Sequence, residues 1–214
     1  MADVRTAIRP PQQKRSRASF ERVLQAAEAL LEEDGYQAFT LAAVGERAKV
    51  SIGSIYARVE SKDALFYAVH ERVMERIIAA SDPFRDVERW ESISTRELVL
   101  EAVREMAEPF REHARLLRVV MHRGAVDEHV AQFGSQTSSA QAELFESLLL
   151  TRRDEIVHPD PELAADVAFR MAYCTIARQI MYGPTFESQR AIQWDELVRE
   201  VGVACATYLL GTGR

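Results

Sequence analysis

The sequence has few cysteines, no long apolar run and no apolar secretory segment, and each absence excludes a class of protein. Its two cysteines, Cys174 and Cys205, belong to no paired motif, so nothing demands a disulfide. The longest apolar stretches fall far short of the roughly 18 residues that a membrane-spanning helix needs. The first twenty residues are basic and polar, unlike a secretory signal. We therefore expect a cytoplasmic protein with no membrane partner.

Signatures of catalysis and of metal binding are also missing. His113, His122, His129 and His158 show no metal-ligand spacing with the cysteines. The sequence contains no glycine-rich phosphate loop, no HExxH pair and no G-x-S-x-G nucleophile turn. We therefore expect neither an enzyme nor a protein with a metal or cofactor.

Charge is distributed unevenly along the chain. The net charge of −6, taken as a whole, argues against a nucleic-acid partner. Residues 1–62, however, hold ten Lys and Arg against eight Asp and Glu, whereas the remainder holds seventeen against twenty-five. A basic end on an acidic chain is typical of a nucleic-acid contact, although basic N-terminal tails are often only solvated. The charge pattern leaves both interpretations open.

No segment alternates as a strand would, and apolar residues recur at helical spacing, which predicts an all-α fold. Residues 1–15, which include Pro10 and Pro11, are predicted to form a disordered arm. A first helix is expected from Ser16 to Asp34, with Gly35 as its stop. Further helices are predicted at residues 41–48, 52–58, 61–80, 94–108, 110–123, 127–157, 161–182 and 191–210.

The helices predicted at 41–48 and 52–58 are joined by a turn of three residues. This is the layout of a helix-turn-helix, in which one helix rests on the DNA backbone and the second enters the major groove. Thr40 and Ser51 stand where the two helices need N-caps. The spacing therefore predicts a DNA-reading motif near the N-terminus.

The second of these helices has a core side and an outward side. Ile55 and Val59 point the same way and are expected to face the core, which leaves Gly53 and Ala57 on the opposite side. Glycine on an exposed helix face costs roughly 1 kcal/mol relative to alanine. A close approach of the backbone to DNA would explain that cost; the alternative is that Gly53 only eases the start of the helix.

The stretch from Thr40 to Leu65 reads TLAAVGERAKVSIGSIYARVESKDAL, and it resembles the signature of the tetracycline-repressor (TetR/AcrR-type) family of transcriptional regulators. Two positions depart from that signature. Lys49 stands where many members have glycine, and Val59 where phenylalanine is common. If position 49 needs a left-handed backbone, lysine is strained there by roughly 1 kcal/mol. The matching residues are Thr40, Ala48, Val50, Ser51, Gly53, Tyr56, Lys62 and Leu65.

The resemblance implies a homodimeric transcriptional regulator that binds double-stranded DNA. In particular it implies a repressor that leaves a near-palindromic operator when it binds a small hydrophobic effector. The alternative is an effector-independent architectural or division-linked DNA-binding protein of the same fold. The implied domains are a helix-turn-helix DNA-binding domain at 16–62 and a larger helical effector-binding and dimerisation domain at 63–214.

Roles on the DNA follow from the matching positions. Thr40, Ser51 and Lys62 are expected to bind phosphates, and Tyr56 a phosphate or a thymine methyl group. Small outward residues read only shape and methyl groups, whereas Arg58 can take a guanine edge or a phosphate. Lys14, Arg15 and Arg17 can add contacts from the arm. The predicted DNA-binding residues are Thr40, Ser51, Ile52, Gly53, Ser54, Tyr56, Ala57, Arg58 and Lys62.

The helix predicted at 161–182 is apolar on two sides, so it needs two partners. One partner is the domain core, and the second can be another subunit. Proteins of the family dimerise through their last two long helices, although a monomer with a thicker core would also satisfy the pattern. The predicted dimer interface consists of Phe169, Tyr173, Ile176 and Ile180.

The other apolar side of that helix is predicted to face an effector pocket. Its walls would be Phe110, Met121, Phe145 and Met171, with Arg178 as the polar contact for an acidic effector. Large apolar residues at helical spacing also form ordinary cores. An arginine in such surroundings also commonly pairs with a nearby glutamate.

Overall fold

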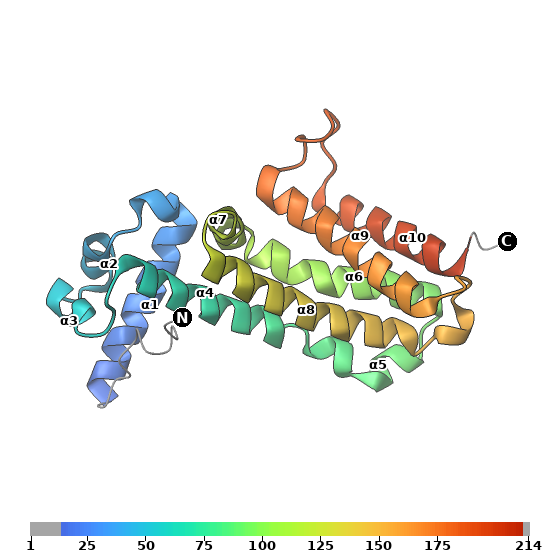
Figure 1. The fold of residues 1–214 in the computed structure, drawn as a ribbon, viewed down its shortest axis with the longest axis horizontal. Helices are drawn as coiled ribbons and strands as arrows, with labels where there is room; N and C mark the ends of the chain where they lie inside the picture. The colour runs from blue at the N-terminus through green and yellow to red at the C-terminus, as the bar shows by residue number, and fades with distance from the viewer. Residues whose placement is uncertain (1–13, 212–214) are drawn as a thin grey trace. The chain divides into compact units, whose positions relative to one another are not determined.

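The structure is a computed structural model that describes residues 14–211, and this part of the chain consists of helices without a strand (Figure 1). The predicted all-α class is therefore confirmed. The predicted arm lies almost entirely outside the described residues. Across residues 14–211 no helix has the length and apolarity that crossing a membrane requires.

The helices follow one another along the chain, mostly through short loops, and Figure 1 labels the α-helices. They are α1 (Lys14–Ala38), α2 (Leu41–Ala48), α3 (Ile52–Tyr56), α4 (Lys62–Ala79), η2 (Asp82–Arg85), α5 (Val87–Glu91), α6 (Thr95–Glu112), α7 (Ala114–Gly124), α8 (Glu128–Leu150), η3 (Arg153–Glu155), α9 (Pro161–Tyr182) and α10 (Trp194–Leu210).

These helices form two compact units. The first comprises the chain up to Glu75 together with Arg118–Phe133, and the second comprises Arg76–Leu117 together with the chain from Gly134 onward. Helices α4, α7 and α8 therefore each begin in one unit and end in the other. The unit that holds the predicted helix-turn-helix also includes most of α4, so the functional boundary predicted at residue 62 stays a prediction.

The first unit is organised around one side of α1. Val23, Ala27 and Leu31 are buried there, as their spacing predicts. Gly35, the predicted stop, breaks α1 with φ 72° and ψ −177°, but α1 continues beyond it to Ala38. Only glycine adopts that conformation without strain. The resulting break carries the chain to Phe39, which is fully buried.

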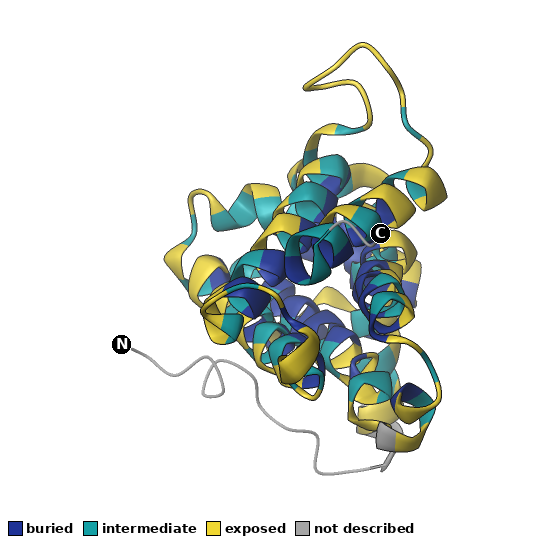
Figure 2. Cartoon of the chain, turned by 90° about the vertical axis from the view of Figure 1, so that its right-hand side faces the viewer, coloured by how far each residue is buried: buried dark blue, intermediate teal, exposed yellow. Residues whose placement is uncertain are grey.

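The second unit is a bundle in which α10 packs against α6 and α9, and α6 packs against α9. Small residues let these helices approach closely, and a Cβ atom added to Gly202 would lie 3.3 Å from the Leu100 Cα. Figure 2 shows the buried residues on the inner sides of the helices, whereas the loop after α9 is exposed. The core includes Leu98, Ala102, Phe145, Ala168, Ile176 and Leu209.

Two predicted helix ends in the second unit are wrong. Pro109 does not end a helix, because α6 continues to Glu112. The φ angle of proline fits a helix, and its missing N–H removes only one hydrogen bond; burial of Pro109 and Phe110 keeps this turn packed. The helix predicted to reach residue 157 ends at Leu150, after which the Thr151 hydroxyl donates to the Leu148 carbonyl at 2.7 Å.

Candidate nucleic-acid interface

Polar side chains cap the helices of the predicted DNA-reading motif. Thr40 Oγ1 accepts a hydrogen bond from the Ala43 N–H at 3.1 Å, and Ser51 Oγ accepts one from the Ser54 N–H at 3.3 Å. The two predicted N-caps are therefore confirmed. The cap uses only a lone pair of Thr40 Oγ1, so its proton can still be donated to another group.

The turn between α2 and α3 contains a strained lysine. Lys49 adopts φ 54° and ψ 46°, the left-handed conformation, and it is the residue other than glycine with a positive φ among residues 14–211. The Val50 N–H donates to the Gly45 carbonyl at 3.0 Å, which closes the turn. A Cβ atom disfavours this conformation, so the turn is formed at a cost in free energy.

We expect Lys49→Gly to raise the free energy of unfolding by about 1 kcal/mol, because glycine relieves the left-handed strain but adds freedom to the unfolded chain. Urea unfolding followed by circular dichroism measures this change. Lys49→Ala is the matched control, because it removes the same charged side chain and keeps the Cβ atom. An equal gain in both variants would show that charge, not backbone strain, is responsible.

Gly45 is a structural requirement of the motif that was not predicted from the sequence. A Cβ atom at this position would lie 2.9 Å from the Val50 carbonyl oxygen and 3.3 Å from the Ile55 Cδ1 atom. Helix α2 therefore approaches the turn and α3 as closely as backbone atoms allow. A glycine in the middle of a short helix is the signal that could have indicated this packing.

Helix α3 presents one buried and one exposed side, as predicted. Ile55 and Val59 are fully buried, whereas the side chains of Ile52 and Tyr56 are 47% and 56% exposed. A Cβ atom added to Gly53 would have no neighbour within 4 Å, so this side of the helix is open. The helix ends at Tyr56, before the predicted end at residue 58. An exposed helix side with small and apolar residues can enter a major groove, which is wide enough for a helix.

Lys62 is already engaged within the protein. Its Nζ donates to the Tyr36 carbonyl at 2.9 Å and lies 4.0 Å from the centroid of the Tyr36 ring. The ammonium therefore holds the end of α1 against the start of α4. A lysine has three N–H donors, so a phosphate contact remains compatible with this geometry and stays a prediction.

A network of charged and phenolic side chains connects α4 to α7 and α8 within the first unit. The Tyr36 hydroxyl donates to the Asp63 carboxylate, which also lies 3.4 Å from Arg123. Arg123 binds Asp127 at 3.0 Å, and the Tyr67 hydroxyl donates to Asp127 at 2.9 Å. This network ties the helix that follows α3 to a segment about 60 residues further along the chain.

The surroundings of this network shift the pKa values of its members. Burial, followed by the hydrogen bond to Asp63, raises the pKa of Tyr36. Burial alone would raise the pKa of Asp127, but hydrogen bonds from Tyr67, the Val130 N–H and Arg123 lower it overall. At neutral pH the phenol therefore stays protonated and the carboxylate stays charged, as the hydrogen bonds require.

His70, on α4, is buried beside this network without a hydrogen bond. Its side chain is 1% exposed, and neither ring nitrogen has a hydrogen-bonding partner. The ring stacks on Phe66 with the centroids 6.2 Å apart and meets the edge of Phe133 at 5.2 Å. Burial, and then the neighbouring His129, lower the pKa of His70 to about 4. The imidazole is therefore neutral at physiological pH.

The residues of the predicted effector pocket lie in different surroundings, and the pocket itself stays a prediction. Phe110 and Phe145 are buried in the core of the second unit, whereas Met171 is exposed. Met121 is half-buried and belongs to the first unit. Arg178 forms an ion pair with Glu187, which is the alternative that the sequence left open. The predicted set therefore divides into core and surface residues.

The residues of the predicted dimer interface lie mostly inside the chain. Phe169, Ile176 and Ile180 are buried inside the chain, and the Phe169 ring packs on Phe145 with the centroids 5.7 Å apart. Tyr173 is half-buried and meets Phe110 edge to face at 5.4 Å. These side chains already fill part of the core of the second unit, whereas the opposite side of α9 is exposed at Leu163 and Met171.

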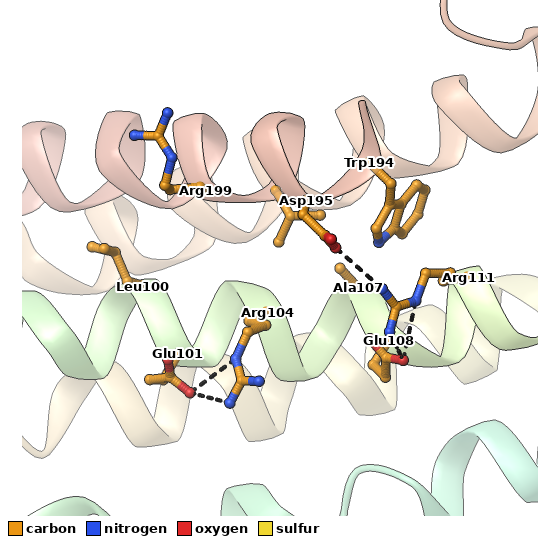
Figure 3. A pocket seen from close by; sticks show the side chains of 10 residues that line it. Leu100, Glu101, Arg104, Ala107, Glu108, Arg111, Trp194, Asp195 and Arg199 are labelled. Atoms are coloured by element: carbon orange, nitrogen blue, oxygen red, sulfur yellow. Dashed lines mark hydrogen bonds and ion pairs between the residues drawn. The ribbon is translucent and has the colours of Figure 1, made fainter. Parts of the chain in front are cut away.

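A concavity of about 380 Å³ between α6 and α10 is lined mainly by charged residues (Figure 3). Arg111 binds both Glu108 and Asp195, the latter at 3.1 Å, and Arg104 binds Glu101. Because these opposite charges neutralise one another, the concavity presents no charge of one sign for a ligand. It therefore gives no indication of a specific occupant.

Comparisons with known proteins agree with this geometry. The family model described as bacterial regulatory proteins, tetR family, matches residues 23–69. The fold is similar to a TetR-family transcriptional regulator from Mesorhizobium loti, with a TM-score of 0.68, 20% identity, and coverage of 92% of this chain and 97% of that one. A TetR-like regulator from Rhodococcus sp. RHA1 gives 0.64 and 21%, with 93% and 97% covered.

A TetR regulator from Haloarcula marismortui is similar at a TM-score of 0.67 and 16% identity, with 91% of this chain and 99% of that one covered. No curated protein shows a significant sequence match. At such low identities the solved structures establish the fold, whereas the family model concerns the helix-turn-helix itself. The chain therefore carries the DNA-binding domain of the TetR family within the fold of TetR-family transcriptional regulators, which confirms the resemblance in its sequence.

Proposed function

We propose that this protein is a cytoplasmic, sequence-specific repressor that binds a near-palindromic operator as a homodimer. The observation that carries the proposal is α3, which buries Ile55 and exposes a small surface around Gly53 beside a capped turn. A recognition helix needs one buried side and one exposed side. The buried side packs on the protein core, and the exposed side contacts base edges.

The proposed contacts fall into two groups. Some bind phosphates and position the protein on the DNA, and the others contact base edges. Thr40 and Ser51 bind phosphates from the ends of α2 and α3, with Lys62 and Arg58 adding positive charge. Tyr56 is exposed and reaches a phosphate or a thymine methyl group. The remaining proposed contacts lie on the outward side of α3 and its continuation, and they are Ile52, Gly53, Ser54 and Ala57.

The proposal is tested by gel shifts on the DNA that flanks the protein's own coding sequence, with unrelated duplexes of equal length as control. A specific complex should bind about 1,000-fold more tightly than the control duplexes. The logarithm of its affinity should fall linearly with the logarithm of salt concentration, because bound phosphates release counterions. Equal affinity for every duplex would contradict sequence-specific regulation.

We propose that the homodimer forms through the exposed side of α9. Leu163, Met171 and Tyr182 are 49%, 36% and 41% exposed, and they lie on the side opposite Phe169. The half-buried Val167 and Met181 share this side at helical spacing. Several apolar residues on one exposed side of a helix are typical of a protein interface. Arg178 lies on the same side, between Met171 and Tyr182, in an ion pair with Glu187. This face lies on the other side of α9 from the interface predicted from the sequence.

We expect Met171→Glu to convert the dimer to a monomer at micromolar concentration, because the symmetric interface would bury two carboxylates. Sedimentation velocity measures the change, and DNA affinity should fall with it. Ser139→Glu, an exposed charge on α8, is the matched control and should leave the dimer intact. A Met171→Glu variant that remains dimeric would place the interface elsewhere.

We also propose that a small hydrophobic ligand releases the protein from its operator. Such control requires a ligand that binds one arrangement of the dimer better than the other. The course of α4 supports it, because this helix begins beside the reading motif and ends in the second unit. DNA-release assays with a ligand that stabilises the protein test this part separately from DNA binding.

A further inference from the structure

A second concavity, lying wholly within the second unit, differs from the charged one in Figure 3. It is a cavity of about 400 Å³ between the segment η2–α5 and the C-terminal half of α8. Its volume falls within the range of small-molecule sites. Its lining includes none of the residues from which the effector pocket was predicted. It is therefore a new candidate site.

The apolar wall of this cavity is aromatic and rigidly held. The rings of Phe84 and Trp90 are nearly parallel, at 23°, with their centroids 6.4 Å apart. The indole N–H of Trp90 donates to the Pro83 carbonyl at 2.8 Å, which fixes the ring. Leu144 and Leu148 of α8 also line the cavity. Aromatic and aliphatic side chains of this kind suit a flat ring system of a ligand.

Two guanidinium groups line the same cavity. Arg152 Nη2 donates to the Trp90 carbonyl at 3.0 Å and to the Glu91 carbonyl at 3.4 Å, so its charge is fixed there. Arg85 binds Asp82 at 2.9 Å, but both side chains are mainly exposed. An exposed ion pair contributes little, so Arg85 can exchange Asp82 for another carboxylate at low cost. Glu91 is the acidic residue of the lining, which leaves a positive balance.

We propose that this cavity binds a small molecule that combines an aromatic ring system with a carboxylate. The rings would lie mainly against Phe84, because Trp90 lines the cavity but is only 3% exposed. The carboxylate would bind Arg85 near the fixed charge of Arg152. A regulatory role for this site rests on the proposed function. The site follows α4 closely in the sequence, since η2 begins three residues after α4 ends. Binding itself requires no DNA, so the two proposals can fail independently.

The test uses 1-pyrenebutyrate as the probe and 1-pyrenebutanol as its neutral counterpart. The sequence has two tryptophans, so Trp194→Phe leaves Trp90 as the sole donor for energy transfer to pyrene. We expect saturable quenching of Trp90 with a micromolar Kd for the carboxylate. The alcohol should bind about fivefold more weakly, and Arg85→Gln should remove most of this difference.

Two serine variants of α8 locate the bound probe. Ser147 lines the cavity and is exposed, so Ser147→Phe fills the space without disturbing the core and should weaken binding by about tenfold or more. Ser139→Phe makes the same substitution at an exposed position away from the cavity and should leave the Kd unchanged. Quenching that does not saturate, that is insensitive to Ser147→Phe, or that is equal for both probes would overturn the proposal.

Discussion

The variant Gly53→Glu is expected to lose specific DNA binding while the protein remains folded. A Cβ atom fits at this position, because no atom outside the adjacent residues and the backbone of its own helix would lie within 4 Å of it. The added carboxylate would stand on the exposed side of α3, where we propose that the backbone approaches the negatively charged groove. Repulsion of like charges at an interface costs several kcal/mol, which corresponds to a loss of affinity of about 100-fold or more.

Gel shifts measure this loss, and urea unfolding confirms that the stability is retained. Gly53→Gln separates volume from charge, since it adds nearly the same bulk without the carboxylate and should retain part of the non-specific affinity. An unchanged gel shift for Gly53→Glu, with the fold intact, would show that α3 does not approach the DNA as proposed.

The second large effect is expected from pH. Burial lowers the pKa of His70 to about 4, whereas an unperturbed histidine titrates near 6.5. The neutral ring therefore contributes stability that is fully present above about pH 6.5 and is lost as the pH falls toward 4. By linkage, the loss should reach about 2 kcal/mol at pH 5 and about 3 kcal/mol at pH 4.

The comparison of wild type with His70→Leu isolates this contribution. Other titrating groups affect both proteins, so the difference between their unfolding free energies reports mainly on His70. The groups that face it are His129, whose charge opposes protonation, and Asp127, whose charge favours it. Leucine also removes two buried nitrogens that have no hydrogen bond. A free-energy difference that stays constant between pH 8 and pH 5 would contradict a buried neutral imidazole.

Sequence rules that act over a few residues correctly predicted the part of the fold that carries the helix-turn-helix. N-cap preferences placed Thr40 and Ser51 correctly, because a cap depends on a hydroxyl and an N–H only a few residues apart. Helical periodicity placed Ile55 and Val59 in the core, and glycine preference placed the break at Gly35. The strain at Lys49 followed from the same reasoning.

Contacts between distant residues could not be predicted in this way. Periodicity shows that α9 is apolar on two sides but not which side the chain itself covers, and the contact of Phe169 with Phe145 decides this. The close approach at Gly45 depends on the turn geometry of Val50. The contact between Asp63 and Arg123 joins residues 60 positions apart, beyond the range of any local pattern.

The most direct test of the central claim is selection of the wild-type protein on a library of random-sequence DNA duplexes. If α3 reads the major groove in a symmetric dimer, the selected sequences should share a near-palindromic motif. Its two half-sites should be centred about one helical turn apart, ~34 Å, or slightly more. Enrichment of no common motif, at salt concentrations that suppress non-specific binding, would contradict the account.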